Sequence, residues 1–263
     1  MDATDTVSFL KGLKMNKSYS YFAKFYDTLT SDIDYKSRAE YFLNIIYRFG
    51  GSTDIILDLA CGTGSLSVEF AKKGIEVIGV DSSYDMLSIA NSKNYENNTA
   101  VLYLCQDSSE LDLYGTVSCV VCALDSINHI TDECKLKETF LKISLFLEPN
   151  GIFIFDCNTI YKHQNILANN TFVYDYEKVY CVWQNTLCND NVSVNISLDF
   201  FEKKINNNYI RYSETFNEKA YSIDYLKAIL DECRLETLCI YEGDTFELIN
   251  NKSQRAVFVC KRK

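Results

Sequence analysis

Long apolar runs are absent from this sequence, and no stretch approaches the roughly 18–20 residues that a membrane-spanning helix needs. The first fourteen residues hold only a short apolar patch at 7–10 with acids before it, which is not typical of a secretory signal. We therefore expect a cytoplasmic protein without a membrane association. Whether 1–14 is native or the chain starts at Met15 stays open.

Basic residues are also scarce, because 26 Lys and Arg stand against 36 Asp and Glu, for a formal net charge of −10. A protein held through many phosphate contacts needs a surplus of Lys and Arg on one face. The one dense basic run, 261–263, is interpreted as a solvated tail. The composition argues against a nucleic-acid partner.

Histidine is rare as well, with two in the chain, whereas cysteine occurs eleven times. A chain of this length without a signal sequence is not a small disulfide scaffold. Cys119 and Cys122 form a CxxC, but they lie in an apolar strand-like run whose positions i and i+3 face opposite sides. No second pair or His-x-His completes a zinc set, so we predict no metal site and interpret the cysteines as reduced core residues.

Apolar periodicity predicts two helices within 19–48, interrupted near 28–34. Strands at 55–59, 75–80, 101–104, 117–124 and 152–155 then alternate with helices at 65–73, 84–92 and 135–147. This alternation predicts a parallel sheet with helices on both faces. The only proline falls in a predicted turn at 148–151.

After residue 158 the pattern changes to strands rich in Val, Ile, Tyr and Phe at 172–183, 192–201 and 209–218, with Asn-rich turns between them. A helix at 222–233 and strands at 235–241 and 256–261 follow. We divide the chain into an N-terminal helical part (1–48), a ligand-binding core (49–158), an antiparallel insertion (159–220) and a C-terminal part that completes the core sheet (221–263).

The segment Asp58-Leu-Ala-Cys-Gly-Thr-Gly64 carries the first functional signal, because a strand ends there, the chain turns on two glycines and a helix begins. Alone, such a turn is better explained by a tight connection that binds nothing. Asp81, however, ends the next strand at about the spacing at which an acid meets ribose hydroxyls, and Gln106 with Asp107 ends the third. Carboxyl ends of parallel strands share one rim, so these residues predict a nucleotide cleft.

Two residues distinguish the ligand from a dinucleotide. The fingerprint GxGxxG requires a glycine at position 67, where this chain has Ser67. An acid at position 58 is also badly placed beside a pyrophosphate but suits a cationic or amino-bearing ligand. This combination points to S-adenosylmethionine.

The segment Asp58–Gly64 resembles motif I of class I S-adenosylmethionine-dependent methyltransferases, with Ala60 in place of the first glycine. The stretch 80–87 resembles the second signature, whose acid holds the ribose and whose methionine covers the adenine. Stretch 106–108 matches the adenine-reading position, and 147–152 matches the turn before strand five, with Asn150 as a departure. For cofactor binding this resemblance implies Asp58, Ala60, Gly62, Gly64, Asp81, Ser82, Met86, Gln106, Asp107, Ser108 and Leu124.

The stretches 21–27 and 125–130 resemble a narrower group of small-molecule N-methyltransferases, including sugar-amine dimethyltransferases and glycine N-methyltransferase. That resemblance implies a Rossmann-like seven-stranded, mostly parallel sheet, an N-terminal helical lid and an antiparallel β insertion after strand five that roofs the substrate pocket. It also implies that lid tyrosines approach the methionyl end of the cofactor. The candidates here are Tyr21, Tyr26 and Tyr35.

Methyl transfer to an amine needs aligned reactants and a nearby base. His129 follows the fourth strand and is the candidate base, with Tyr26 as a second candidate catalytic residue, and Asp125, Asn128 and His129 as candidate substrate contacts. His163 is interpreted as a surface residue. We expect a small-molecule acceptor, with nitrogen as the methylated atom. An RNA methyltransferase and a cofactor-binding module without turnover remain alternatives, and the acceptor's identity and the oligomeric state stay open.

Overall fold

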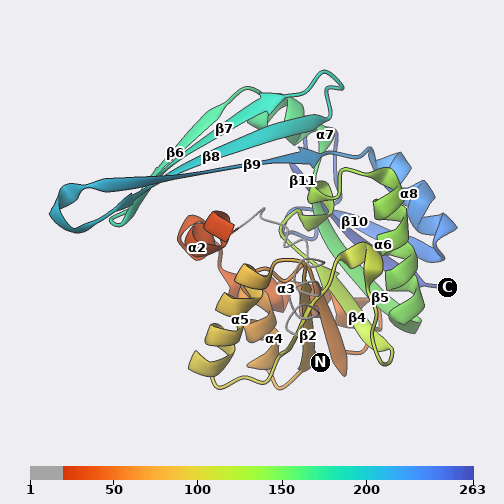
Figure 1. Ribbon diagram of the computed structural model, residues 1–263. Helices are drawn as coiled ribbons and strands as arrows, with labels where there is room; N and C mark the ends of the chain where they lie inside the picture. Colours follow the sequence, from red (N-terminus) through yellow and green to blue (C-terminus); the bar gives the residue numbers. More distant parts are fainter. Residues whose placement is uncertain (1–19) are drawn as a thin grey trace, which may run out of the picture.

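The computed structural model describes residues 20–263, and the leader discussed above lies outside them. Two sheets dominate the molecule (Figure 1). The first has seven strands in the order β10-β11-β5-β4-β1-β2-β3, and the second has four in the order β6-β7-β8-β9. No helix of the described part is long and apolar enough to cross a membrane.

In the large sheet, β5, β4, β1, β2 and β3 run parallel to one another. Strand β11 lies between β5 and β10 and runs antiparallel to both. This confirms the predicted Rossmann-like, mostly parallel sheet of seven strands. The strands are β1 (Ile55–Leu59), β2 (Glu76–Asp81), β3 (Leu102–Cys105), β4 (Val117–Cys122), β5 (Leu147–Asn158), β10 (Leu235–Glu242) and β11 (Arg255–Arg262).

Helices cover both faces of this sheet, as the alternation predicted. One face packs against α3 (Tyr35–Arg48) and α4 (Ser65–Ala71), with Phe42, Ile46 and Phe70 fully buried. The other packs against α6 (Glu133–Phe146) and α8 (Ile223–Glu232), where Phe140 and Leu230 are fully buried. Helix α5 (Tyr84–Glu96) lies beside α4 (Figure 1).

Alternation along β4 places Cys119 in the core under α3 and Cys122 in the core under α6. The prediction that this CxxC points to opposite faces is therefore confirmed. Burial raises the pKa of both thiols, which keeps them protonated. Six of the eleven cysteines are buried, and all eleven are free thiols.

The small sheet forms a long blade over α2 (Ser20–Leu29), as Figure 1 shows. Its strands are β6 (Thr171–Asp175), β7 (Val179–Leu187), β8 (Ser193–Lys203) and β9 (Tyr209–Lys219). Phe22 and Phe25 of α2 pack against Phe200 and Phe216 of this sheet, and Met86 of α5 joins the same cluster. A third apolar core thus ties the N-terminal helix to the insertion.

Two sequence-based expectations were wrong. The predicted turn at 148–151 lies inside β5, which begins at Leu147 and absorbs an irregularity in its register with β4. His163, interpreted as a surface residue, is fully buried in the short helix η3 (His163–Leu167), and its Nδ1 lies 2.8 Å from the carbonyl oxygen of Val192. Its place between the fifth strand and the first strand of the insertion suggested exposure, but Val192 of the insertion packs against this segment.

One buried carboxylate links four parts of the fold. Asp156 of β5 is fully buried and accepts hydrogen bonds from Arg38 of α3 and Arg255 of β11, each at 2.9 Å. Its other oxygen accepts the backbone N–H of Asp125, after β4, at 2.7 Å. A buried carboxylate is tolerated only when it is paired in this way.

We expect Asp156→Ala to lower the free energy of unfolding by about 3–5 kcal/mol, because two arginine side chains would lose their common buried partner. Chemical denaturation monitored by circular dichroism measures this change. Glu232→Ala is the control, since it removes an exposed ion pair with Lys137 and should change stability far less. Equal losses for the two variants would contradict the assignment.

Candidate functional site

A cleft lies at the carboxyl ends of β1, β2, β3 and the segment after β4. It consists of three adjoining cavities of about 260, 140 and 30 Å³. Ala60 lines all three, and Asp81, Ser82, Ser126 and His129 line both of the larger ones. The strand ends singled out in the sequence therefore do meet along one continuous surface, as ligands of open parallel sheets require.

The glycine turn after β1 needs left-handed backbone at three positions: Ala60 (φ 56°), Gly62 (φ 56°) and Gly64 (φ 72°). The two glycines differ in what surrounds them. A Cβ on Gly64 would collide with the hydroxyl of Tyr103 at 2.3 Å, whereas one on Gly62 would meet nothing within 4 Å. Gly64 thus allows close packing of the turn against Tyr103, and Gly62 leaves the backbone of the turn accessible from the cleft. Ala60 adopts the strained conformation without being glycine.

Asp81 holds this turn in place. Its carboxylate accepts the backbone N–H of Gly62 at 2.9 Å and that of Ser83 at 2.8 Å. Burial nevertheless raises the pKa of Asp81, because desolvation outweighs these hydrogen bonds. Ser83 in turn caps α5 by accepting the N–H of Met86. The end of β2, the turn and the start of α5 are therefore one hydrogen-bonded unit.

Asp58 lies at the floor of the smallest cavity and is buried. Desolvation raises its pKa to about 7, even though the hydroxyl of Ser67 donates a hydrogen bond to it. Ser67, which distinguishes this turn from a dinucleotide fingerprint, is thus a direct partner of the acid. Two poorly solvated carboxylates, Asp58 and Asp81, form a site that favours a positive charge.

The 260 Å³ cavity, the largest of the three in the cleft, is lined by Gln106, Asp107 and Ser108 from the end of β3. The amide of Gln106 exchanges two 3.0 Å hydrogen bonds with the backbone of Asp112. Asp107 is partly desolvated, but hydrogen bonds from Ser109 and the charge of Lys135 lower its pKa below the usual value. These contacts fix the loop after β3 and leave an anionic group at its edge.

Helix α2 closes the cleft from above. Tyr26 lines both smaller cavities and Tyr35 the smallest one, while Leu124 and Met86 complete the walls. Asp27 anchors the helix by bonding to Thr63 of the glycine turn at 2.7 Å and to Lys93 of α5 at 2.6 Å. Tyr21 is different, because it is 46% exposed and its ring packs 4.8 Å from that of Tyr212, outside the cavity lining.

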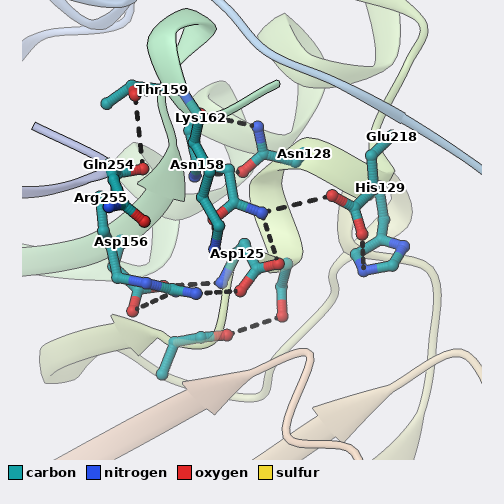
Figure 2. A network of polar contacts seen from close by, with 12 residues as sticks. Asp125, Asn128, His129, Asp156, Asn158, Thr159, Lys162, Glu218, Gln254 and Arg255 are labelled. Atoms are coloured by element: carbon teal, nitrogen blue, oxygen red, sulfur yellow. Dashed lines mark hydrogen bonds and ion pairs between the residues drawn. The ribbon is translucent and has the colours of Figure 1, made fainter. Parts of the chain in front are cut away.

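The segment after β4 carries the other predicted residues (Figure 2). Asp125 has left-handed backbone (φ 53°), and its two oxygens bind Arg255 at 2.7 Å and Asn158 at 2.8 Å. Asn128 is fully buried, and its amide bonds to the backbone of Asn158 and Lys219. Both side chains are thus committed to the framework, which leaves His129 as the residue of this trio that faces the cavities.

Sequence reasoning missed Glu218. This residue of β9 is buried, and its carboxylate lies 3.6 Å from Nε2 of His129 (Figure 2). The available signal was the alternation of β9, which puts Glu218 on the same inward face as Phe216. A carboxylate at an inward position of a half-buried strand is unusual enough to mark a site.

Comparisons with known proteins agree with this geometry. A family model described as a methyltransferase domain matches residues 56–151. The chain is 30% identical to a protein of Geobacillus sp. (strain WCH70) named as a methyltransferase, over 93% of this chain and 100% of that one. The crystal structure of an S-adenosylmethionine-dependent methyltransferase from Clostridium acetobutylicum ATCC 824 is similar with a TM-score of 0.84, at 31% identity over 93% of this chain and 98% of that one.

This chain belongs to the S-adenosylmethionine-dependent methyltransferases. The resemblance deduced from the motifs is thereby confirmed, together with the cofactor. Over a shorter stretch the methyltransferase is also 29% identical to a glycine/sarcosine N-methyltransferase of Parasynechococcus marenigrum (strain WH8102), covering 52% of this chain and 50% of that protein. The cleft fits a cofactor with a sulfonium and an ammonium group, since Asp58 and Asp81 are desolvated carboxylates that a cation would stabilise.

The raised pKa of Asp58 makes the methyltransferase's stability depend on pH. Relative to an ordinary carboxyl, Asp58 contributes stability that is present below pH 4 and is lost as pH rises through about 7, because the buried group must then ionise. We expect the free energy of unfolding of Asp58→Asn, relative to that of the wild type, to rise from pH 5 to pH 8. The rise should be about 3 kcal/mol at pH 8. Urea unfolding at a series of pH values measures this difference.

Asp54→Asn is the matched control, since Asp54 is exposed and precedes the same strand. Its stability difference from the wild type should not change over this pH range. A constant difference for Asp58→Asn as well would show that the carboxyl is ionised throughout.

Proposed function

We propose that the protein transfers a methyl group from S-adenosylmethionine to a nitrogen atom of a small-molecule acceptor. The observation that carries this proposal is the position of His129, at the junction of the two larger cavities and beneath the insertion. An imidazole at this junction is within reach of a reacting amine and is able to take up its proton near neutral pH. The similarity to a glycine/sarcosine N-methyltransferase supports nitrogen as the methylated atom.

The cofactor would occupy the largest and the smallest of the three cavities, which share Ala60 and Ser126 with the 140 Å³ cavity. We assign its adenosine to the largest one, with Asp81 and Ser82 at the ribose and Gln106, Asp107 and Ser108 around the adenine. Leu124 lines the two smaller cavities and would contact the cofactor there instead. Met86 would cover the ring from the start of α5. The methionyl end would lie in the smallest cavity, between Asp58, Ala60, Tyr26 and Tyr35, with Gly62 on the adjoining cavity. Gly64 lines none of the three cavities, so we assign it no cofactor contact. We do not assign Tyr21 a contact, since it packs on the insertion.

The acceptor would occupy the 140 Å³ cavity, which is bounded by Phe22, Tyr26, Met86 and His129. Residues 159–220 would act as its roof. A cavity of this size beneath a sheet suits a small molecule, and the net charge of −10 disfavours an RNA acceptor. The eleven free thiols favour a reducing compartment such as the cytoplasm.

The chemistry requires few participants. S-adenosylmethionine supplies a methyl carbon on a sulfonium, and the electrons of the broken bond return to sulfur. The acceptor amine arrives as an ammonium ion and must lose one proton before its lone pair attacks. His129 would take that proton, while Tyr26 and Phe22 align the amine with the methyl carbon. Alignment accounts for on the order of 7–11 kcal/mol in such reactions, and a base for 10²–10⁴-fold.

Incubation with methyl-labelled S-adenosylmethionine and a panel of amino acids, amino sugars, phenols and a short RNA tests this function by mass spectrometry. We expect label on at least one amine, and none on phenols or RNA. His129→Gln should lower kcat on that amine by 10²-fold or more and remove the acid limb of its pH profile. Label on oxygen, or an unchanged profile in the variant, would contradict the assignment of nitrogen or of the base.

The ribose assignment gives a separate prediction. Asp81→Ala should weaken binding of S-adenosylmethionine and S-adenosylhomocysteine by more than tenfold in calorimetry, because the proposed ribose contact and the support of the Gly62 turn would both be lost. The control is Asp85→Ala, which removes an exposed acid one turn further on. Equal affinities for the two variants would show that the ribose lies elsewhere.

A further inference from the structure

Glu218 lies between the only two histidines of the chain. One oxygen, Oε1, is 3.6 Å from Nε2 of His129, and the other, Oε2, is 3.7 Å from Nε2 of His163. The three residues come from distant segments, since His129 follows β4, His163 follows β5 and Glu218 ends β9. Glu218 and His163 are both buried, while the side chain of His129 is 29% exposed toward the cleft.

The tautomer of His163 is determined by its surroundings. Its Nδ1 faces the carbonyl oxygen of Val192 at 2.8 Å, and a carbonyl only accepts hydrogen bonds, so Nδ1 carries a proton. A neutral ring would then present a lone pair at Nε2 to the carboxylate of Glu218. Nε2 has no hydrogen-bond partner among the described residues, and a lone pair 3.7 Å from a carboxylate oxygen in a buried site is repulsive.

The charges around the pair favour an additional proton. Asn158 donates to Oε2 of Glu218 at 3.3 Å, which favours the ionised carboxylate. The buried carboxylates of the connected network differ in their partners. Asp125 and Asp156 pair with arginines, whereas the ion pairs of Glu218 within the described residues are those with His129 and His163. A proton on His163 would give this buried carboxylate a cationic partner.

We propose that Glu218 holds a proton on Nε2 of His163 and orients His129 as the base, so that the roof sheet supplies a positioning residue for methyl transfer. With the Nε2 proton of His129 directed at Oε1, the basic nitrogen of the neutral ring is Nδ1. When His129 takes the proton of the acceptor ammonium, the resulting imidazolium lies beside a carboxylate whose charge is already partly balanced by His163. The catalytic part of this proposal rests on the proposed function, whereas the protonation of His163 does not.

Because the chain has two histidines, NMR can follow the protonation of each histidine ring separately. In tag-free protein with ¹⁵N-labelled histidine, NMR at pH 7 should show His163 protonated on both nitrogens, and Glu218→Gln should return Nε2 to the unprotonated form. His163→Asn identifies the signals, because the asparagine amide retains a donor toward Val192 but lacks Nε2. An unprotonated Nε2 in the wild type, unchanged by Glu218→Gln, would overturn the proposal.

The catalytic arm uses the amine methylated fastest in the panel above. Glu218→Gln should lower kcat about tenfold with little change in cofactor affinity, and it should move the acid limb of the pH profile to lower pH, because the anion that stabilises the protonated ring is gone. Asp199→Asn removes a carboxylate of the same sheet that pairs with Arg211, away from the cleft, and should leave kcat and the profile unchanged.

The outcomes separate the two claims. If no amine is methylated by the wild type, the proposed function fails, while the NMR result still decides on the proton of His163. If amines are methylated but the profile of Glu218→Gln matches the wild type, Glu218 does not act on His129. A wild-type profile displaced by added Zn²⁺ or Mn²⁺ would show that the carboxylates and His129 bind a metal ion instead, and would likewise overturn the proposal.

Discussion

The fully buried carboxylate of Asp156 is the constraint on which the cleft depends. It joins α3, β5 and β11 through two arginines and holds the backbone of Asp125. That contact fixes a left-handed backbone at the end of β4, where a non-glycine residue costs about 1–2 kcal/mol. Because His129 follows four residues later, the position of the candidate base is determined by an ion pair in the core.

The same network extends from the core into the roof. Asn158, at the end of β5, bonds to Asp125, to Asn128 and to Glu218 of β9. Helix α2 makes a second connection, because Asp27 bonds to the glycine turn while Phe22 and Phe25 pack on the roof sheet. Helix α2, the small sheet and the glycine turn are therefore linked by contacts that share residues, so a change in any one of them alters the cavity between them.

Prediction from sequence succeeded where function depends on residues close together in the chain. The turn at Asp58–Gly64, the acid Asp81 and the stretch after β3 all line the cleft, because successive parallel strands end at one rim. It failed at His163, which was interpreted as a surface residue, and it did not anticipate the full burial of Asn128, a candidate substrate contact. Both are buried by contacts with β9 or the segment before β8, more than twenty-five residues away along the chain.

The sequence by itself determined the alternating sheet, the class of cofactor and the rim of the sheet where the cleft lies, since these follow from local periodicity and from motifs shorter than ten residues. Only the tertiary structure decided which acids are free to meet a ligand. Asp125 forms an ion pair with Arg255, whereas Glu218, which belongs to no sequence motif, lies 3.6 Å from His129. The physical reason is that pairing and desolvation depend on long-range contacts, and these decide whether a carboxylate supports the framework or serves the chemistry.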